Sequence, residues 1–257
     1  MDITTKKYFN EIETAAYRRD GFIVARGMFD ERAIRELSGW IDKLVARGPE
    51  SGKEMFYLED SLLEKGKSVL SRIERFADFN AELHGFIEDE RLRGRVRELL
   101  GGEPELFKEK INFKLPGGGG FAPHQDIQPG WDDYAPYFIS VLVTIDKSTV
   151  ENGCLELSPG HHRRGLLGEK WKPLTEEQLQ GVDFTAYPME PGDVAFFDCF
   201  VPHRSKPNLT DRPRRNLYLT YNLAKDGRWR EKYFSDKRKN YPPDNEREPG
   251  KEYIFRV

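Results

Sequence analysis

The chain has 257 residues, of which 37% are hydrophobic and 33% are charged, and its formal net charge is -3 at pH 7. This length suits one well-buried domain with additions, and the nearly neutral balance argues against a basic footprint for nucleic acid or another polyanion. We therefore expect a single domain that spans residues 1–257 and has a small-molecule partner, with neither a nucleic-acid nor a membrane partner. The composition carries no information about the oligomeric state.

The N-terminus and the cysteines give an expectation about location. The first residues lack the apolar segment of a signal peptide, and no apolar run approaches the ~18 residues of a membrane span. Cys154 and Cys199 have no CxxC spacing, which fits a reducing compartment. We expect a cytoplasmic protein in which Cys199 is a buried thiol without a catalytic part.

Residues 1–103 are expected to form a mostly helical scaffold. A short apolar strand is predicted within residues 21–29, and Asp30 is placed to cap a helix with an apolar stripe at three and four residue steps. A second helix is predicted from about residue 80 to residue 100, ending at Gly101 and Gly102. The intervening residues 50–79 fit either a loop or a short helix.

A strand is predicted from Leu106 to Leu115, where polar and apolar side chains alternate. One face is polar and carries Lys108, Lys110, Asn112 and Lys114, whereas the other carries Phe107, Ile111, Phe113 and Leu115, with Glu109 as the exception. The polar face has two explanations. The lysines protect an exposed sheet edge, or they line a polar cavity.

Further strands are predicted at residues 137–145, 154–157, 193–200 and 216–222, each rich in β-branched or aromatic residues. No helix between them is long enough for a βαβ crossover. The pattern indicates a mainly β domain with an antiparallel double-sheet jelly roll, a cupin-like double-stranded β-helix, over residues 104–225. Residues 163–185 are expected to be an excursion between strands, and residues 226–257 a surface extension.

A candidate metal site combines His124, Asp126 and His203. Residues i and i+2 of an extended segment point to the same side, so His124 and Asp126 can reach one ion. Two imidazoles and one carboxylate that leave other positions open are typical of non-haem Fe(II) oxygenases.

The other histidines have structural explanations. His84 lies beside apolar residues of a predicted helix, and His161 and His162 follow the turn-forming run Ser158-Pro159-Gly160. We predict no metal ligation by any of these three.

Two arginines follow the distal histidine. The rigid fork of an arginine binds a carboxylate through two hydrogen bonds, so Arg214 and Arg215 are candidate anchors for a dicarboxylate. As neighbours on a strand they point to opposite faces.

A set of short motifs runs through most of the chain. These are residues 21–24 and 27–29, His124-Gln125-Asp126, the segment from Asn152 to His162, Pro191-Gly192-Asp193, His203-Arg204-Ser205, and Arg214. Together they resemble the phytanoyl-CoA dioxygenase-like family of Fe(II)/2-oxoglutarate-dependent oxygenases. The resemblance implies that His124, Asp126 and His203 bind Fe(II), and that Arg214 holds the far carboxylate of 2-oxoglutarate. Arg215, whose side chain points to the opposite face of the strand, is then expected to be structural.

The resemblance also implies a reaction. O2 and 2-oxoglutarate would be consumed, and succinate and CO2 would be released as the substrate is hydroxylated. Family members that halogenate replace the metal carboxylate by a small residue, so the presence of Asp126 favours hydroxylation.

Contacts to the cosubstrate are implied by the same resemblance for Lys108, Asn112, Thr144 and Ser205. Lys110 faces the same side and would suit an anionic group of the substrate, although an ion pair with a nearby acid explains it equally well.

The loop at residues 127–134 is expected to overhang the metal. Trp131 and Tyr134 would wall the pocket, and Asp132 and Asp133 would attract a cation. An acidic, aromatic rim over a basic strand suits a small zwitterion. The stretches 124–134 and 152–157 are most similar to family members that hydroxylate 2-aminoethylphosphonate next to phosphorus. Two alternatives keep the same chemistry, with another compatible solute or an acyl thioester as the substrate. A third alternative is a jelly-roll binding protein without catalysis.

Overall fold

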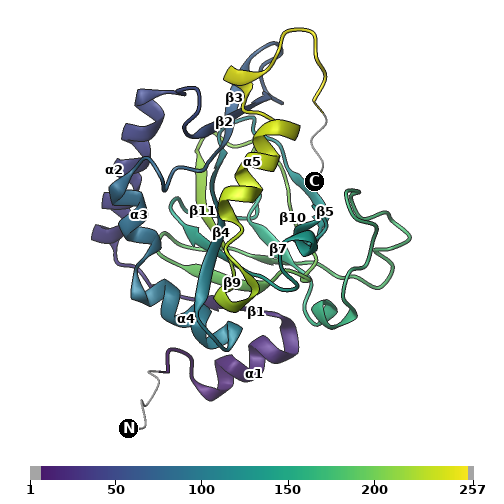
Figure 1. Ribbon diagram of the computed structural model, residues 1–257. Helices are drawn as coiled ribbons and strands as arrows, with labels where there is room; N and C mark the ends of the chain where they lie inside the picture. Colours follow the sequence, from purple (N-terminus) through teal and green to yellow (C-terminus); the bar gives the residue numbers. More distant parts are fainter. Residues whose placement is uncertain (1–6, 254–257) are drawn as a thin grey trace.

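Two antiparallel β-sheets face each other in the computed structural model, which describes residues 7–253 (Figure 1). The larger sheet has the strand order β1 (Phe22–Ala25), β9 (Val194–Asp198), β6 (Ile139–Thr144), β11 (Arg214–Leu223), β4 (Pro104–Lys114), β3 (Ser68–Glu74) and β2 (Met55–Asp60). The smaller sheet has the order β5 (Phe121–His124), β10 (His203–Ser205), β7 (Leu155–Leu157) and β8 (Thr185–Tyr187). The predicted double-sheet jelly roll is confirmed.

Strand β4 lies inside the larger sheet, between β11 and β3. Its lysines therefore do not protect an edge. Across the sheet, Asn112 of β4 is paired with Asn216 of β11, and Asn216 is paired with Thr144 of β6, so polar residues of neighbouring strands share one face. This polar face is turned toward the smaller sheet and carries the candidate site.

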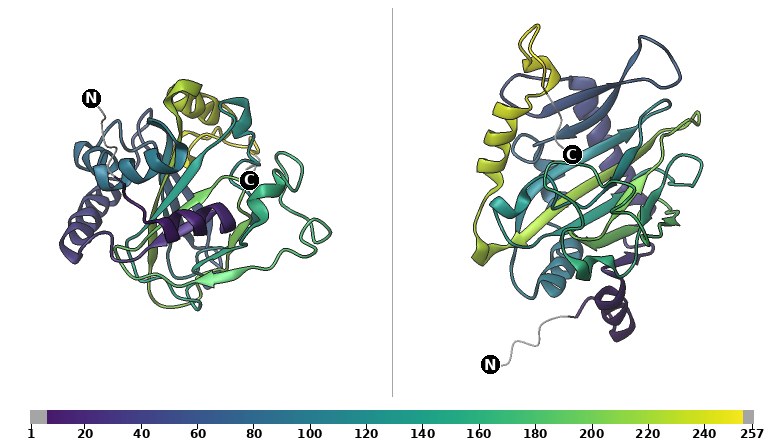
Figure 2. Two further views of the ribbon diagram at one scale, coloured as in Figure 1. Left: turned by 90° about the horizontal axis from the view of Figure 1, so that it is seen from below. Right: turned by 90° about the vertical axis from the view of Figure 1, so that its right-hand side faces the viewer.

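The opposite face of the larger sheet is apolar and packs against helices. These are α1 (Glu11–Asp20), α2 (Glu31–Arg47), α3 (Ala81–Ile87) and α4 (Glu90–Leu100), which Figures 1 and 2 show on the outer side of the sheet. Asp30 caps α2 by accepting from the Ala33 N–H at 2.8 Å, as predicted. Leu37 and Ile41 of α2 are fully buried in this core, and each contributes roughly 1.5–3 kcal/mol of burial energy.

The helix predicted over residues 80–100 is two helices. Asn80 caps α3 through the Leu83 N–H, and Asp89 caps α4 through the Arg91 N–H. A polar cap at Asp89 competes with a continuous helix, because its carboxylate binds a backbone N–H that would otherwise donate within the helix. The prediction missed this break because Leu83, Ile87 and Leu92 continue the apolar pattern across it.

The N-terminal part of the chain is less helical than predicted. Residues 50–79 form the β2–β3 hairpin, and β1 also joins the larger sheet. Three of the seven strands of that sheet therefore come from the segment that was expected to be a helical scaffold. No helix within residues 7–253 is long and apolar enough to cross a membrane.

Phe107 does not join the apolar face on which the alternation placed it. Thr220 pairs with Lys108 and Tyr221 pairs with Leu106, which leaves Phe107 as the extra residue of a β-bulge. Its ring lies 4.7 Å from that of Phe138 in a separate aromatic cluster beneath the 127–138 loop. The bulge thus turns Phe107 and Lys108 toward the same region.

The C-terminal extension is not only a surface wrapping. It contains the 3-10 turns η3 (Ala224–Asp226) and η4 (Asp244–Glu246) and the helix α5 (Arg230–Asn240), which crosses beside β4 (Figure 1). Phe234 of α5 is fully buried. Arg230 donates to both oxygens of buried Glu109, which explains the acidic exception on β4. Helix α5 therefore closes one side of the polar face.

Candidate metal centre and cavity

The two candidate imidazoles are brought together by the smaller sheet. His124 of β5 and His203 of β10 are directly paired, and their ring centroids lie 4.2 Å apart. The Nε2 atom of His203 lies 3.8 Å from an oxygen of Asp126, and one ligand atom from each of the three residues lies within 4.8 Å of the others. The three donor groups therefore gather around one point, as the ligands of a single ion must.

Hydrogen bonds outside the triad orient all three ligands. His124 Nδ1 lies 2.7 Å from the Ala122 carbonyl, and His203 Nδ1 lies 3.0 Å from the Val201 carbonyl. Because a carbonyl only accepts, each Nδ1 carries the proton and each Nε2 keeps its lone pair for a metal. The Ser140 hydroxyl donates to the second oxygen of Asp126. Burial lowers the pKa of His124 to about 3, so its imidazole is neutral and able to ligate.

Gln125 fixes the backbone between His124 and Asp126. Its amide donates to the Gly165 and Phe200 carbonyls, and its carbonyl accepts from the Leu167 N–H. Strand β5 ends at His124, so Asp126 lies in the following turn rather than on the extended segment that the sequence suggested. The carboxylate reaches the imidazoles because this turn is held by a buried amide.

A buried guanidinium lies at one end of the polar face. Arg214 is 3% exposed, and no carboxylate of residues 7–253 lies within ion-pair distance of it. Burial lowers the pKa of Arg214, and its Nε has no hydrogen-bond partner in the described part of the chain. A buried charge without a counter-ion is costly, so the site fits an anionic ligand that supplies one.

Three of the four predicted cosubstrate contacts share this end of the face. Asn112 and Thr144 flank Asn216, two residues along β11 from Arg214, and the Oδ1 atom of Asn112 lacks a partner among the described residues. Ser205 accepts from the Lys114 ammonium at 2.7 Å. Lys114 is itself paired with Arg214 across the strands.

Lys108 is placed elsewhere. It is paired with Thr220, six residues along β11 from Arg214, which corresponds to roughly 20 Å at the rise of a strand. Its ammonium lies 4.4 Å from the Trp131 ring centroid and 3.3 Å from the Tyr233 hydroxyl. Lys108 therefore lies at the other end of the polar face from Arg214, and its contact with the cosubstrate stays a prediction.

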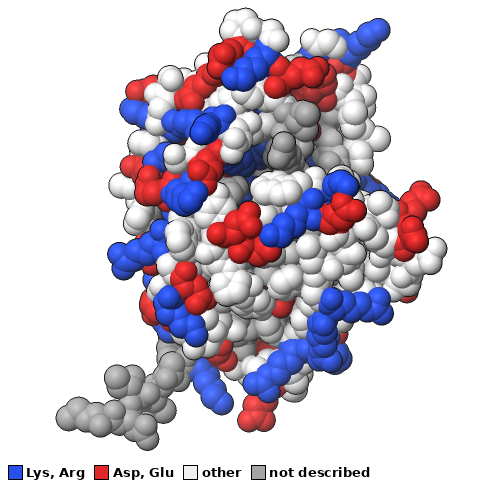
Figure 3. All heavy atoms as spheres, turned by 45° about the vertical axis from the view of Figure 1, so that its right-hand side comes forward, with Lys and Arg blue, Asp and Glu red and all other residues white. Residues whose placement is uncertain are grey.

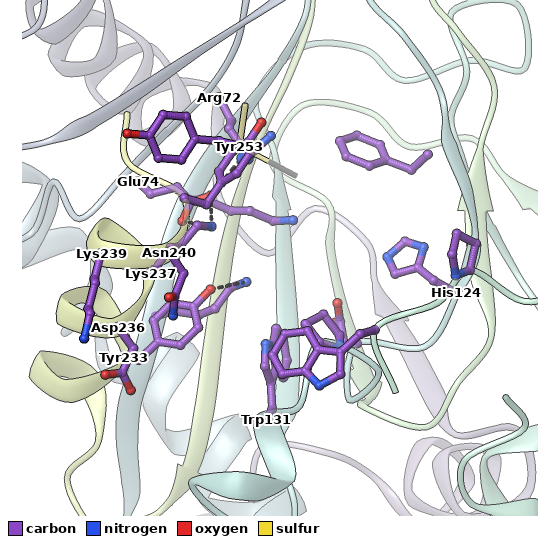
Figure 4. Close-up of a pocket in the computed structure, with 18 of the residues that line it drawn as sticks. Arg72, Glu74, His124, Trp131, Tyr233, Asp236, Lys237, Lys239, Asn240 and Tyr253 are labelled. Atoms are coloured by element: carbon purple, nitrogen blue, oxygen red, sulfur yellow. Dashed lines mark hydrogen bonds and ion pairs between the residues drawn. The ribbon is translucent and has the colours of Figure 1, made fainter. Parts of the chain in front are cut away.

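A cavity of about 860 Å³ opens beside the triad. Its lining includes His124, Asp126, Lys108, Lys110, Trp131 and Tyr134 from the sheets and the loop, Arg72 and Glu74 from β3, and Tyr233, Asp236 and Lys237 from α5 (Figure 4). Lys110 lies 4.9 Å from the Tyr218 ring centroid, and no carboxylate of residues 7–253 forms an ion pair with Lys108 or Lys110. Burial lowers the pKa of both lysines.

The acidic rim differs from the prediction. Asp132 and Asp133 do not line the cavity, and both are bound by Lys170 from the 163–185 excursion. Trp131 is 2% exposed and forms part of the wall, and Tyr134 donates to Asp236 at 2.7 Å. The cavity carboxylate nearest this wall is therefore Asp236 of α5. Positive and negative groups are interspersed over the molecular surface shown in Figure 3.

Sequence reasoning missed several residues of the site. Ser140 was missed, although it is, with the predicted Thr144, one of the two polar residues in the otherwise apolar strand β6, which was a usable signal. Lys114 shares the polar face of β4, so the alternation also marked it. Arg72, Glu74 and Lys237 gave no local signal, because only the tertiary fold brings β3 and α5 to the cavity.

The residues predicted to be structural lie apart from the triad. His84 is exposed on α3, and His161 bonds Ser158 at 2.9 Å and the Gly181 carbonyl at 3.0 Å. Arg215 pairs with Asp146 at 2.8 Å on the helical face. Cys199 is fully buried, as predicted. The glycines that precede β5 pack closely, since a Cβ at Gly120 would lie 2.7 Å from the Ser205 carbonyl.

Comparison with known proteins gives consistent matches. The model of the phytanoyl-CoA dioxygenase (PhyH) family matches residues 17–216. A 2-aminoethylphosphonate dioxygenase from an uncultured bacterium, HF130_AEPn_1, is 37% identical over 96% of this chain and 94% of its own. A methylphosphonate hydroxylase from Gimesia maris is 35% identical, covering 88% of this chain and 85% of its own. The crystal structure of EctD from S. alaskensis with 2-oxoglutarate and 5-hydroxyectoine is 26% identical, with a TM-score of 0.74 over 88% of this chain and 80% of that one.

Proposed function

The chain belongs to the phytanoyl-CoA dioxygenase family and is an Fe(II)/2-oxoglutarate-dependent dioxygenase. From this premise we propose that its substrate is a small phosphonate, with 2-aminoethylphosphonate as the first candidate. Family membership removes the alternative of a binding protein without catalysis. The similarity to a 2-aminoethylphosphonate dioxygenase supports this substrate, and so does the similarity to a methylphosphonate hydroxylase.

In the proposed site, His124, Asp126 and His203 hold Fe(II), and Arg214 holds the far carboxylate of 2-oxoglutarate with help from Ser205. Asn112 and Thr144 lie where they can complete the polar wall around the cosubstrate. When bound, the iron supplies activation of O2 coupled to decarboxylation of 2-oxoglutarate. The protein orients the metal ligands through the Ser140 hydroxyl and the backbone carbonyls of Ala122 and Val201. It also places the substrate next to the metal.

The observation that carries the substrate proposal is the pair Lys108 and Lys110. Both ammonium groups face the cavity beside the triad, and neither has a carboxylate partner in the described part of the chain. Buried ammonium groups are costly unless an anion compensates them. A doubly charged phosphonate supplies that compensation, and Tyr134 with Asp236 offers an aromatic and acidic wall for the amine.

The proposed reaction balances. One C–H bond next to phosphorus becomes C–OH, one oxygen atom of O2 enters that hydroxyl, and the other enters the succinate formed from 2-oxoglutarate as CO2 leaves. No further reductant is required, because 2-oxoglutarate supplies the two electrons.

A coupled turnover assay tests the substrate. Fe(II)-loaded enzyme with 2-oxoglutarate and O2 should release one succinate for each hydroxylated 2-aminoethylphosphonate. Methylphosphonate, ectoine and an acyl thioester form the comparison set. Succinate release that is uncoupled from phosphonate hydroxylation, or coupled turnover only with one of the other compounds, contradicts the proposal and leaves the oxygenase class intact.

The second candidate is another compatible solute with the same chemistry. Ectoine dioxygenases are related at 24% to 27% identity. The two unpaired lysines argue against this candidate, because ectoine's single carboxylate would leave the second ammonium without a counter-ion.

A further inference from the structure

The cavity wall opposite the triad contains a second group of charged residues. Arg72 Nε donates to Glu74 at 2.8 Å, and Lys237 of α5 donates to both oxygens of Glu74 at 2.7 and 2.6 Å. Glu74 is 1% exposed, and the side chain of Lys237 is 12% exposed. Figure 4 shows these residues converging from β3 and α5.

This group is continuous with the lysines of β4. Glu74 and Lys110 are directly paired across β3 and β4, so their side chains leave the same face of the sheet. Lys108 and Lys237 both lie over the Tyr233 ring, with ammonium-to-centroid distances of 5.4 and 5.9 Å. The positive charge of Lys237 acts on Lys108 and Lys110, since burial and the neighbouring cations together lower the pKa of Lys108.

Four cationic side chains, Arg72, Lys108, Lys110 and Lys237, gather around Glu74. The cavity is also lined by the carboxylates of Glu59, Asp126, Asp236 and Glu252, but none of these forms an ion pair with Lys108, Lys110 or Lys237 in the described part of the chain. Of the other cavity carboxylates, Asp236 is already bound by Lys232 at 2.5 Å and by Tyr134. A cluster of buried ammonium groups without carboxylate partners is a site for a multiply charged anion.

We propose that Lys237, on the C-terminal helix, is a specificity-determining residue that binds the phosphonate oxyanion together with Lys108 and Lys110. This inference rests on the proposed function for the identity of the substrate. Glu74 positions Lys237, because its carboxylate holds the ammonium at the cavity wall. A carboxylate has a single charge and two oxygens, whereas a phosphonate has three oxygens for three ammonium donors, so the group selects phosphonates over carboxylates.

Binding measured without turnover tests the proposal. Anaerobic enzyme carrying Fe(II) and 2-oxoglutarate is titrated calorimetrically with 2-aminoethylphosphonate, methylphosphonate, inorganic phosphate and β-alanine. Lys237→Met should raise the dissociation constant of the three phosphorus oxyanions by about 10- to 100-fold, as expected for loss of a charged hydrogen bond. For β-alanine, whose acid group is a carboxylate, Lys237→Met should raise the dissociation constant less. Lys237→Arg should retain most of the affinity for the phosphorus oxyanions, because it keeps the positive charge.

Lys232→Met is the matched control. Lys232 is on the same helix, its side chain is 59% exposed, and it does not line the cavity, so its loss should leave the dissociation constants of the two probes without an amine, methylphosphonate and inorganic phosphate, unchanged. Thermal unfolding and 2-oxoglutarate affinity separate a binding role from a structural one. Unchanged oxyanion affinity in a folded Lys237→Met protein overturns the proposal, and so does an equal loss of affinity for oxyanions, β-alanine and 2-oxoglutarate.

The failure of the proposed function has a different signature. If 2-aminoethylphosphonate is not turned over but phosphate and methylphosphonate bind in a Lys237-dependent way, the oxyanion site stands and the substrate is another phosphorus compound. If none of the tetrahedral anions binds the wild-type complex, the oxyanion site is wrong whatever the enzyme oxidises.

Discussion

His124 and His203 face each other across the antiparallel pair β5 and β10, with their imidazole centroids 4.2 Å apart. Each Nδ1 is fixed by a backbone carbonyl two residues earlier in the chain, at Ala122 and Val201. The smaller sheet therefore sets both the distance and the tautomer of the two imidazoles. The third candidate ligand, the carboxylate of Asp126, is oriented by the Ser140 hydroxyl.

Loss of one imidazole should abolish the metal complex. His203→Ala leaves one histidine and one carboxylate, and we expect no visible charge-transfer absorption when Fe(II) and 2-oxoglutarate are added without O2. His161→Ala is the control, because His161 bonds only Ser158 and backbone carbonyls. A normal absorption band in the His203→Ala protein would show that the metal site lies elsewhere.

Ser140→Ala should weaken iron binding while leaving all three ligands in place. The Ser140 hydroxyl donates to Asp126 from strand β6, and the loss of such an outer hydrogen bond typically reduces metal affinity by about 10- to 100-fold. Competitive titration with a chelator measures the change. Ser158→Ala removes another buried hydroxyl outside the site and should have no effect on the same titration.

Arg214 and Arg215 should separate cosubstrate binding from stability. Arg214→Met removes the buried guanidinium and should weaken 2-oxoglutarate binding by about 10- to 100-fold, the range for loss of a hydrogen bond to a charged group. Arg215→Met instead breaks the ion pairs with Asp146 and Asp42 on the helical face.

The Arg215→Met protein is therefore expected to unfold at lower urea concentration and to keep its 2-oxoglutarate affinity. Fluorescence titration and urea unfolding on both variants check this division. A loss of 2-oxoglutarate affinity in Arg215→Met as large as that in Arg214→Met would contradict the assignment.

Stability should depend on acid pH through Glu74. Burial alone would raise the pKa of Glu74, but Lys237 and Arg72 outweigh it and hold that pKa well below its usual range. The unfolded chain binds a proton near pH ~4.3, whereas the folded protein stays ionised to lower pH. The contribution of Glu74 to stability is therefore complete above that pH and is lost as the pH falls further.

Urea unfolding of wild type and Glu74→Gln measures this effect. At pH 7 the variant should be less stable by about 3–5 kcal/mol, because it leaves buried cations without a counter-ion. The difference between the two proteins should shrink as the pH is lowered toward ~3. A difference that stays constant from neutral to acid pH would mean that the Glu74 carboxylate contributes no ionic stabilisation.

The fold and the centre of the site were predictable from local patterns. The strands of the jelly roll have clear apolar and β-branched runs. The motif at His124 and Asp126, with His203 later in the chain, indicates a metal site of two histidines and one carboxylate. The polar face of β4 was visible in the alternation from Lys108 to Lys114, although its meaning was open. Only the position of β4 between β11 and β3 excluded an edge.

The cavity wall was not predictable, because it depends on contacts between distant segments. The bulge at Phe107 changes the face of one residue without a sequence signal, and Asp132 and Asp133 are taken by Lys170 from a loop that follows much later. The C-terminal helix has little amphipathic pattern, so nothing in the sequence marked Phe234 and Lys237 as inward-facing.

The sequence by itself predicted the jelly-roll class and the three candidate iron ligands, because these rest on short-range periodicity and on side chains with few alternative roles, and the resemblance to the family singled out Arg214 as the arginine for 2-oxoglutarate. The tertiary structure decided which charges meet in the cavity. Glu74, Lys108 and Lys237 come from three separate elements, and electrostatic pairing depends on distances in space that no local pattern encodes.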